Sequence, residues 1–455
     1  MNGEPPLIEG VARYALSAGP PSEQVAAIAQ ELLLDALGVG IVGLTNPLSA
    51  AALEVARGWG EGAQAAVWGR DGVRLPAGAA AFVNAHQIHC FEFDPVNEPA
   101  VVHPTSVVLP VLAAWVQRER TRGRPLVPGR EFLRAFVVGV EVAAGLGVAC
   151  VDAPRFFRPA TAGALGAVAA LCALRHPTDE LAIAAFTTAY CALCGTMQGH
   201  EDGAEIQPLQ MGTNARAALD AVDLAQAGFR GPRHMLEGSY GYYSIYEAGG
   251  DLGGLLERLG THSEVARTGI KPYPSGRATH PAIDAALDLR AEHGLQADAV
   301  RAVEVSVPPL VHGLVGREPA ADLAPGTARL CLRHLLAAAL EDGRVDLRSC
   351  TRERLADPAV LDLARRVRIV AVPGRDPNAL LPQSVRIELA HGRSLERTAT
   401  ATLGSPERPV DRERLECKFR DNLAAGGCAD RADAIIDAVA GIAALADVTA
   451  LLDLL

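Results

Sequence analysis

The chain has 455 residues, of which 49% are hydrophobic and 21% are charged; this composition is that of a globular protein and excludes a largely disordered one. Its formal net charge of -11 argues against a nucleic-acid partner, because binding phosphates requires a basic face. The start of the chain shows no signal peptide, and the most apolar stretches are short or interrupted by Gly, Pro or charge. We therefore expect a cytoplasmic protein without a membrane partner and, from its length, two domains.

Most of the chain before residue 260 has apolar residues at helical spacing. The clearest example is residues 22–43, where Ser22 is a suitable cap for the helix that follows. The same spacing, with Gly and Pro between the segments, predicts further helices over 48–58, 77–91, 105–118, 129–150, 161–175, 179–194, 214–227 and 279–292. One short strand is expected near 65–68. The first 260 residues are therefore expected to be almost entirely helical.

The pattern changes after about residue 296. Residues 300–307 alternate between apolar and polar side chains, which predicts a half-buried antiparallel strand. Two further segments, 366–372 and 384–389, alternate in the same way. Helix is expected between the strands over 328–339, and it returns at the end of the chain over 412–423 and 431–455. These patterns predict a mainly α fold with an inserted α+β domain. The large helical domain would comprise 1–268 and 409–455, and the smaller α+β domain 269–408.

Four segments place titratable and polar residues beside Gly or Pro within apolar surroundings. They are His86–Asp94 with His103-Pro104-Thr105-Ser106; Arg155–Gly163; Gly195–Asp202 with Gln207–Gly212; and Gly269–His280. Cys191 and Cys194 have C-x-x-C spacing, but no second pair or histidine stands at zinc spacing, so we interpret them as buried small side chains. The sequence therefore predicts no metal site.

These four segments, in this order and spacing, resemble those of the MmgE/PrpD family. The resemblance extends over essentially the whole chain and includes the phrases Leu33–Gly40, Ala227–Pro232, Ala282–Ala285 and Lys418-Phe419. It implies a two-domain architecture with the active site in a cleft between the domains. It also implies a lyase of the dehydratase or decarboxylase type for a small carboxylate, a homodimer, and no metal or organic cofactor.

His103 and Lys271 are the first candidates for catalysis. His103 precedes Pro104 at the start of an expected helix, where an imidazole can act as a general acid or base; a capping or packed histidine is the alternative. Lys271 is one of only two lysines, with Lys418, among 42 basic residues. Where charge alone is needed this chain uses Arg, so a retained lysine suggests an amine that can exchange a proton. The resemblance also implies catalysis at both positions, whereas Lys418 is expected to be structural.

Other residues are candidates for holding the substrate. Arg277 could bind a carboxylate through two parallel hydrogen bonds, and Arg158 stands where relatives usually carry a histidine before proline. The remaining candidates are His280, Tyr273, His200, Gln207 and Gln210. Surface ion pairs, helix-start hydrogen bonds or a solvated loop are the alternatives for these residues.

The chain also departs from the family pattern. The acidic run of relatives is shifted here, so that Glu92 or Asp94 would stand in for the family's aspartate. Gln207 and Gln210 replace a lysine and a histidine, and Gly276 replaces a cysteine or histidine. With fewer cations, the pocket is expected to take a substrate with fewer negative charges. A lyase is the leading interpretation; an isomerase, epimerase or cyclase using the same proton transfers, or a non-catalytic binding homologue, are the alternatives.

Overall fold

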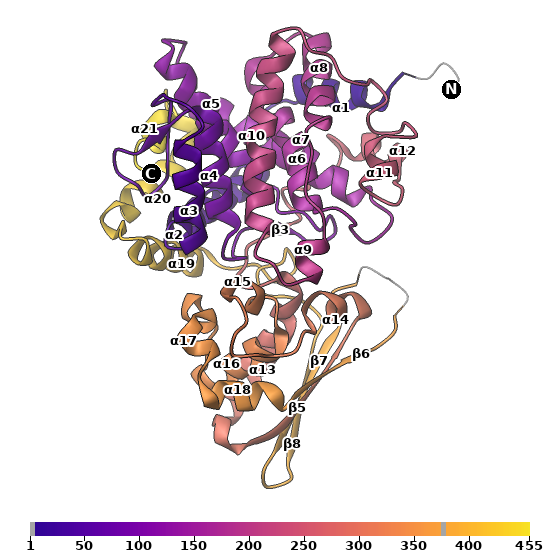
Figure 1. Ribbon diagram of the computed structural model, residues 1–455, viewed down its shortest axis with the longest axis vertical. Helices are drawn as coiled ribbons and strands as arrows, with labels where there is room; N and C mark the ends of the chain where they lie inside the picture. The colour runs from indigo at the N-terminus through magenta and orange to yellow at the C-terminus, as the bar shows by residue number, and fades with distance from the viewer. Residues whose placement is uncertain (1–4, 375–378) are drawn as a thin grey trace.

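The computed structural model describes residues 5–374 and 379–455. Figure 1 shows a large helical part with a smaller part of helices and strands beneath it. The helices of the large part are α1 (Leu7–Ser17), α2 (Glu23–Gly43), α3 (Pro47–Arg57), α4 (Ala77–His89), α5 (Thr105–Thr121), α6 (Gly129–Val148), α7 (Arg158–Arg175), α8 (Asp179–Tyr190), α9 (Gln198–Glu201), α10 (Gln207–Gln226), α11 (Tyr242–Ile245), α12 (Leu252–Arg258), α19 (Arg412–Ala425), α20 (Ala432–Ala440) and α21 (Thr449–Leu452). This part contains α1 and α21, the first and last helices of the described chain.

Helix α2 is a core helix of this part. It begins where the Ser22 hydroxyl accepts a hydrogen bond from the Val25 backbone N–H at 3.3 Å. Its length and composition would let it cross a membrane, but 67% of its most apolar window is buried inside the protein. The helix packs against α4 and α19 and carries a buried carboxylate, Asp35. A charge within the core requires a partner, which the site described below supplies.

Small residues allow α6 and α7 to pack at close range. A side chain at Gly139 would lie 2.9 Å from the carbonyl oxygen of Gly166, and one at Gly166 would lie 2.5 Å from the carbonyl oxygen of Gly139. The two helices therefore touch backbone to backbone, and side chains fill the space on either side. This rigid pair carries Phe157 and Arg158 at the start of α7, next to the site.

The smaller part contains α13 (His280–His293), α14 (Pro309–Val315), α15 (Pro325–Ala328), α16 (Leu332–Asp342), α17 (Arg352–Leu355) and α18 (Pro358–Arg365). Its sheet contains β5 (Val300–Val307), β6 (Val367–Ala371), β7 (Gln383–Leu389) and β8 (Ser394–Ala399), in the order β6-β5-β7-β8. Helices α13, α16 and α18 pack against these strands on one side. The inserted α+β part is therefore present.

The sheet corrects two sequence-based expectations. Strands β5 and β6 pair in parallel, not antiparallel, because helices α16 to α18 bring the chain back across the sheet before β6 begins. Strand β8 was not predicted; it pairs antiparallel with β7, with Ser384 opposite Thr398. Its burial alternates only weakly, since it forms the sheet edge, and so its period-2 signal is poor.

The two parts meet around residues 92–104 and 268–277. Strand β3 (Val96–Asn97) pairs with β4 (Thr268–Gly269), while β1 (Ala65–Ala66) and β2 (Arg74–Leu75) form a separate pair. The apolar core of the helical part extends to Ile270, and that of the smaller part begins at Tyr273. Lys271 therefore lies where one hydrophobic core gives way to the other.

Candidate active site

The segment between α4 and α5 carries most of the polar groups of the site. Two of its residues, Glu92 and Val101, have a φ of 52°, a left-handed conformation that is uncommon for side chains of these types. The buried amide of Asn97 holds the segment: its oxygen accepts from the Ala100 N–H at 3.1 Å, and its nitrogen donates to the Glu264 carbonyl at 3.1 Å. The segment is thus fixed against the rest of the helical part, and strained backbone of this kind often occurs at functional sites.

Asp94 lies at the centre of this segment and is fully buried. Its Oδ2 atom lies 3.0 Å from His89 Nδ1 and 3.0 Å from His103 Nδ1, and it also accepts a hydrogen bond from the Ser106 hydroxyl. One carboxylate therefore faces two imidazoles, from the end of α4 and the start of α5. Both rings are oriented through Nδ1, which leaves each Nε2 atom pointing away from Asp94.

The two histidines differ in protonation. Burial alone would lower the pKa of His89, but the neighbouring Asp94 and Glu92 carboxylates raise it to about 10. Burial lowers the pKa of His103 from its ordinary value, although Asp94 opposes this shift. At neutral pH the site therefore combines an imidazolium at His89 with a neutral imidazole at His103.

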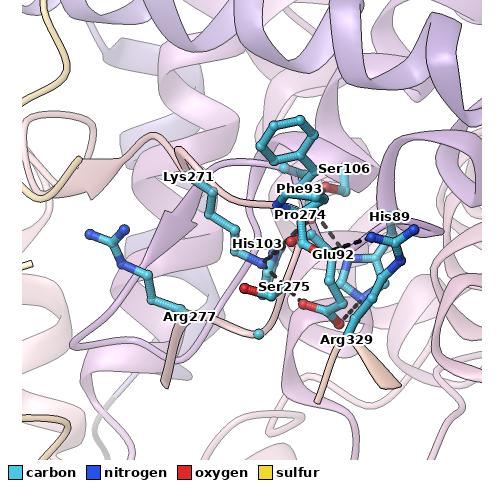
Figure 2. A network of polar contacts seen from close by, with 12 residues as sticks. His89, Glu92, Phe93, His103, Ser106, Lys271, Pro274, Ser275, Arg277 and Arg329 are labelled. Atoms are coloured by element: carbon cyan, nitrogen blue, oxygen red, sulfur yellow. Dashed lines mark hydrogen bonds and ion pairs between the residues drawn. The ribbon is translucent and has the colours of Figure 1, made fainter. Parts of the chain in front are cut away.

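Lys271 reaches the same group from the smaller part. Its fully buried ammonium donates to the Glu92 carbonyl at 2.9 Å and to Glu92 Oε2 at 3.0 Å, and it lies 4.0 Å from Asp94 Oδ1. Burial opposes ionisation of Glu92, but Lys271 and His89 hold its pKa well below the usual value. Figure 2 shows this arrangement, with the Lys271 side chain running toward Glu92 and with His89 and His103 beside it.

The second lysine, Lys418, binds the backbone of the Lys271 segment. Lys418, on α19, donates to the backbone carbonyls of Lys271 at 2.9 Å and Phe93 at 3.0 Å, and its Nζ lies 2.6 Å from Asp35 Oδ1. Burial raises the pKa of Asp35 to about 6 in spite of Lys418, and burial lowers the pKa of Lys418 itself. This pair therefore ties the backbone at Phe93 to the backbone at Lys271 within the core.

A cavity of about 120 Å³ lies next to this network, between the two parts. Glu92 and His103 line it from the helical part, together with Phe157 and His200, and Arg277 lines it from the smaller part. The rest of the wall is mostly apolar and includes Val96, Val101, Met197, Leu310, Leu314 and Leu380. Asp94 and Lys271 do not line the cavity; they lie behind Glu92 and His103. Glu98, the partner of Arg277, lines the cavity as well, so a molecule in it would meet two carboxylates, two imidazoles and one guanidinium.

Comparison with known proteins agrees with this architecture. The sequence profile of the MmgE/PrpD N-terminal domain matches residues 9–254, and that of the MmgE/PrpD C-terminal domain matches residues 273–442. The chain belongs to the MmgE/PrpD family. It is 29% identical over 447 residues to the cis-aconitate decarboxylase of Mus musculus, which covers 94% of this chain and 88% of the relative. Identity to the cis-aconitate decarboxylase of Homo sapiens is 27% over 455 residues, covering 97% and 92%. These relatives support an enzyme of the dehydratase or decarboxylase type.

The fold of this MmgE/PrpD protein brings several predicted site residues together. His103, Glu92, Asp94 and Lys271 form one connected cluster. Arg277 and His200 face the adjoining cavity. The Arg277 Nε atom lies 2.6 Å from Glu98 Oε1, and its buried Nη2 atom has no hydrogen-bond partner among the described residues. Their catalytic or binding roles stay predictions.

Other predicted residues of this family member lie outside the cavity. The guanidinium of Arg158 forms a buried bidentate pair with Glu247, at 2.8 and 3.0 Å, so it is not free to hold a substrate carboxylate. Tyr273 donates to Asp284 at 2.7 Å, and His280 Nε2 lies 3.2 Å from the Ser275 carbonyl at the start of α13. Each of these polar groups is used by the protein itself.

The two glutamines also separate. Gln207 lines a smaller neighbouring cavity together with Glu92 and His200. The Gln210 amide instead donates to the Thr196 carbonyl at 3.2 Å, away from both cavities. Gln207 and Gln210 lie one turn apart at the start of α10, and the two turns have different neighbours, so the two amides do not line the same cavity.

Sequence reasoning missed His89, Ser106 and Arg317 as site residues. His89 had a visible signal, because His86 and His89 stand three residues apart near the end of an alanine-rich apolar helix. Ser106 follows the His-Pro pair and resembles an ordinary first-turn residue. Arg317 belongs to a loop of the smaller part, and nothing local distinguishes it from the many surface arginines.

The cluster also bears on metal binding. Donor atoms of His89, Asp94 and His103 lie within 4.8 Å of one another, a donor set that a divalent cation can use. These residues fit a metal poorly as they stand: Asp94 Oδ2 already faces two imidazoles and the Ser106 hydroxyl, and His89 would have to lose its proton. The expectation of no metal and no cofactor stays a prediction.

The pKa values of the two imidazoles beside Asp94 should be shifted in opposite directions, upward for His89 and downward for His103. In nitrogen NMR spectra of the histidine rings, His89 should be doubly protonated at pH 8 and His103 neutral at pH 7. Because the folded pKa of His89 is raised above 6.5, its charge stabilises the fold below about pH 6.5, and this contribution is lost as the pH rises through about 10. Replacing Asp94 by asparagine should lower the pKa of His89. Two rings that both titrate near pH 6.5 would contradict this assignment.

Proposed function

We propose that this protein is a lyase that removes carbon dioxide or water from a small carboxylate, with His103 as the group that exchanges a proton with the reacting carbon. The observation that carries this proposal is the orientation of His103: Nδ1 faces Asp94 at 3.0 Å, and the ring lies at the wall of the cavity. A carboxylate this close to Nδ1 favours the tautomer with the proton on Nδ1 and leaves Nε2 as the reactive nitrogen. This is the arrangement that general acid–base catalysis requires.

The lowered pKa of His103 keeps the ring in its base form at neutral pH. In a dehydration, the neutral ring takes a proton from carbon while the C–O bond of the leaving hydroxyl breaks. In a decarboxylation, the bond between carbon and the leaving carboxyl group breaks to release carbon dioxide, and its electron pair stays on carbon. That carbon then takes a proton from the minor protonated form of His103, which water protonates again. The imidazolium of His89 and the ammonium of Lys271 lie within the same network and stabilise negative charge nearby.

Lys271 has a different position from the one expected of a proton donor. Its Nζ is fully buried and bound to Glu92, which lies between it and the cavity. We propose that Lys271 is a positioning residue that keeps Glu92 ionised and fixed, while proton transfer by Lys271 itself stays a prediction. Glu92 would then orient the substrate and exclude anions from its side of the cavity.

The charges around the cavity support a substrate with fewer negative charges than a tricarboxylate. Arg277 is paired with Glu98, Lys271 with Glu92, and the position of a family lysine is the neutral Gln207. The apolar wall adds room for a hydrocarbon segment. A molecule with three carboxylates would meet too few free cations, because each buried anion requires a partner.

A substrate series tests this proposal. Purified protein is incubated with unsaturated and 2-hydroxylated acids that carry one, two or three carboxylates, including cis-aconitate. The molecular masses of the products are then measured by mass spectrometry. We expect products lighter by carbon dioxide or water, with turnover of the mono- and dicarboxylates exceeding that of cis-aconitate. Products of unchanged mass would instead indicate an isomerase. Brisk turnover of cis-aconitate above all others would contradict the charge argument while leaving a lyase.

A further inference from the structure

Two arginines, Arg277 and Arg317, line the cavities of the site, and Arg317 is the one that no carboxylate neutralises in the part of the chain that the structure describes. Arg329 also has no carboxylate partner there, but it donates to the Pro274 carbonyl at 2.8 Å and lines neither cavity. Arg158 is paired with Glu247 and Arg277 with Glu98, but the only hydrogen bond of the Arg317 guanidinium is from Nη2 to the His200 carbonyl at 3.2 Å. Its Nε atom is buried without a hydrogen-bond partner. Burial lowers the pKa of Arg317, since the guanidinium gives up water without gaining an acidic neighbour.

A buried nitrogen of the helical part, in His200, resembles the Nε atom of Arg317 in lacking a hydrogen-bond partner among the described residues. The Nε2 atom of His200 is also buried without a hydrogen-bond partner. Burial and the adjacent Arg317 lower the pKa of His200, so its ring is neutral at pH 7, and Nε2 donates in the tautomer that carries the proton there. Arg317 Nε and His200 Nε2, from different parts of the protein, are thus both buried without a hydrogen-bond partner in the described chain. Buried donors of this kind normally have a partner.

Both residues line a narrow cavity of about 30 Å³ that adjoins the larger one. The two cavities share Glu92, His200 and Leu330 in their walls, so a molecule beside His103 can extend toward Arg317. Glu205 is the other acid of the narrow cavity, but it accepts from the Gly326 N–H at 2.5 Å and is engaged there. Gln207 adds a neutral amide to the same wall.

We propose that Arg317, assisted by His200, is the anchoring site for a non-reacting carboxylate of the substrate. The guanidinium offers the fork of N–H groups that carboxylates bind best, and the bound anion would neutralise a cation that no carboxylate of the described chain compensates. Because Arg317 belongs to the smaller part and His200 to the helical part, the anion also bridges the two. This inference rests on the proposed function for the identity of the ligand, a small organic acid, but not for the existence of the anion site.

Binding measured without turnover tests the site. Glutarate, a saturated dicarboxylate, is titrated into the full chain by calorimetry, alongside its monoamide, which has one charge fewer and nearly the same shape. We expect glutarate to bind more tightly than the monoamide, and Arg317→Gln to weaken glutarate binding by about 10- to 100-fold and to abolish the preference. Arg317→Lys should retain part of the preference, because it keeps the charge without the fork.

Arg301→Gln is the matched control, since Arg301 is an exposed arginine of the same part that pairs with Glu388 on the sheet. It should leave glutarate binding unchanged. With a turned-over acid, Arg317→Gln should raise KM by a similar factor and change kcat by no more than about threefold, as expected for a group that binds both ground and transition state.

Three results separate the possible failures. If Arg317→Gln and Arg317→Lys both fold and bind glutarate as tightly as the unsubstituted protein, the anchoring site is overturned. The same holds if Arg277→Gln, and not Arg317→Gln, removes the preference for glutarate over its monoamide. If glutarate binding depends on Arg317 while no acid of the substrate series is turned over, the proposed lyase function fails and the anion site stands.

Discussion

Replacing His103 by asparagine should lower kcat by about 10²- to 10⁴-fold on whichever acid the substrate series identifies as preferred. The asparagine amide can still donate to Asp94 from nearly the place of Nδ1, so the buried carboxylate keeps its partner. The substitution removes Nε2, the nitrogen proposed to exchange a proton with the substrate. Steady-state kinetics should show the loss in kcat, with little change in the affinity for glutarate.

His391→Asn is the control for this substitution. His391 is an exposed histidine between β7 and β8, far along the sheet from the cavity, and its replacement should leave kcat unchanged. A folded His103→Asn protein that keeps more than about a tenth of the original kcat would remove His103 from the catalytic step. In that case the other acid–base groups at the wall, Glu92, Glu98 and His200, would be the candidates for the proton transfer.

Replacing Lys418 by methionine should lower the free energy of unfolding by about 3–5 kcal/mol, because it leaves the Asp35 carboxylate buried without its cation. It also removes the hydrogen bonds to the carbonyls of Lys271 and Phe93, so the site should lose activity beyond what the stability change explains. Urea unfolding followed by far-ultraviolet circular dichroism measures the first effect, and kcat at a temperature where the variant is fully folded measures the second.

A double variant separates charge from position. Adding Asp35→Asn to Lys418→Met removes both charges and should restore most of the lost stability, since burial already opposes both ionised groups. It should not restore kcat, because the two carbonyls stay unheld. Arg412→Met provides the control on the same helix: its exposed pair with Glu416 should cost only about 0.3–0.5 kcal/mol. A Lys418→Met protein as stable and as active as the original would show that the buried pair does not organise the site.

The two rare lysines show how far sequence reasoning reached. Their scarcity singled out Lys271, and the structure places it within the cluster of Glu92 and Asp94. The same scarcity applied to Lys418, whose position in a helical tail suggested only a structural role. In the fold the two are adjacent, since the Lys418 ammonium binds the Lys271 carbonyl across 147 residues of chain. No local pattern encodes that contact.

The long helices, strands β5 to β7, the division into helical and α+β parts, and family membership could be worked out from the sequence by itself, whereas β8 and the short helices of the smaller part could not. These features depend on periodicity, capping and the order of motifs, all of which are written along the chain; α2, β5 and the His-Pro start of α5 are examples. Only the tertiary structure decided which acid each cation meets and which nitrogen faces the cavity. Arg158 is taken by Glu247, Arg277 by Glu98, and Arg317 by none in the described chain. The physical reason is that a charge's partner depends on burial and on the packing of segments far apart in sequence, and the parallel pairing of β5 with β6 depends on the same long-range packing.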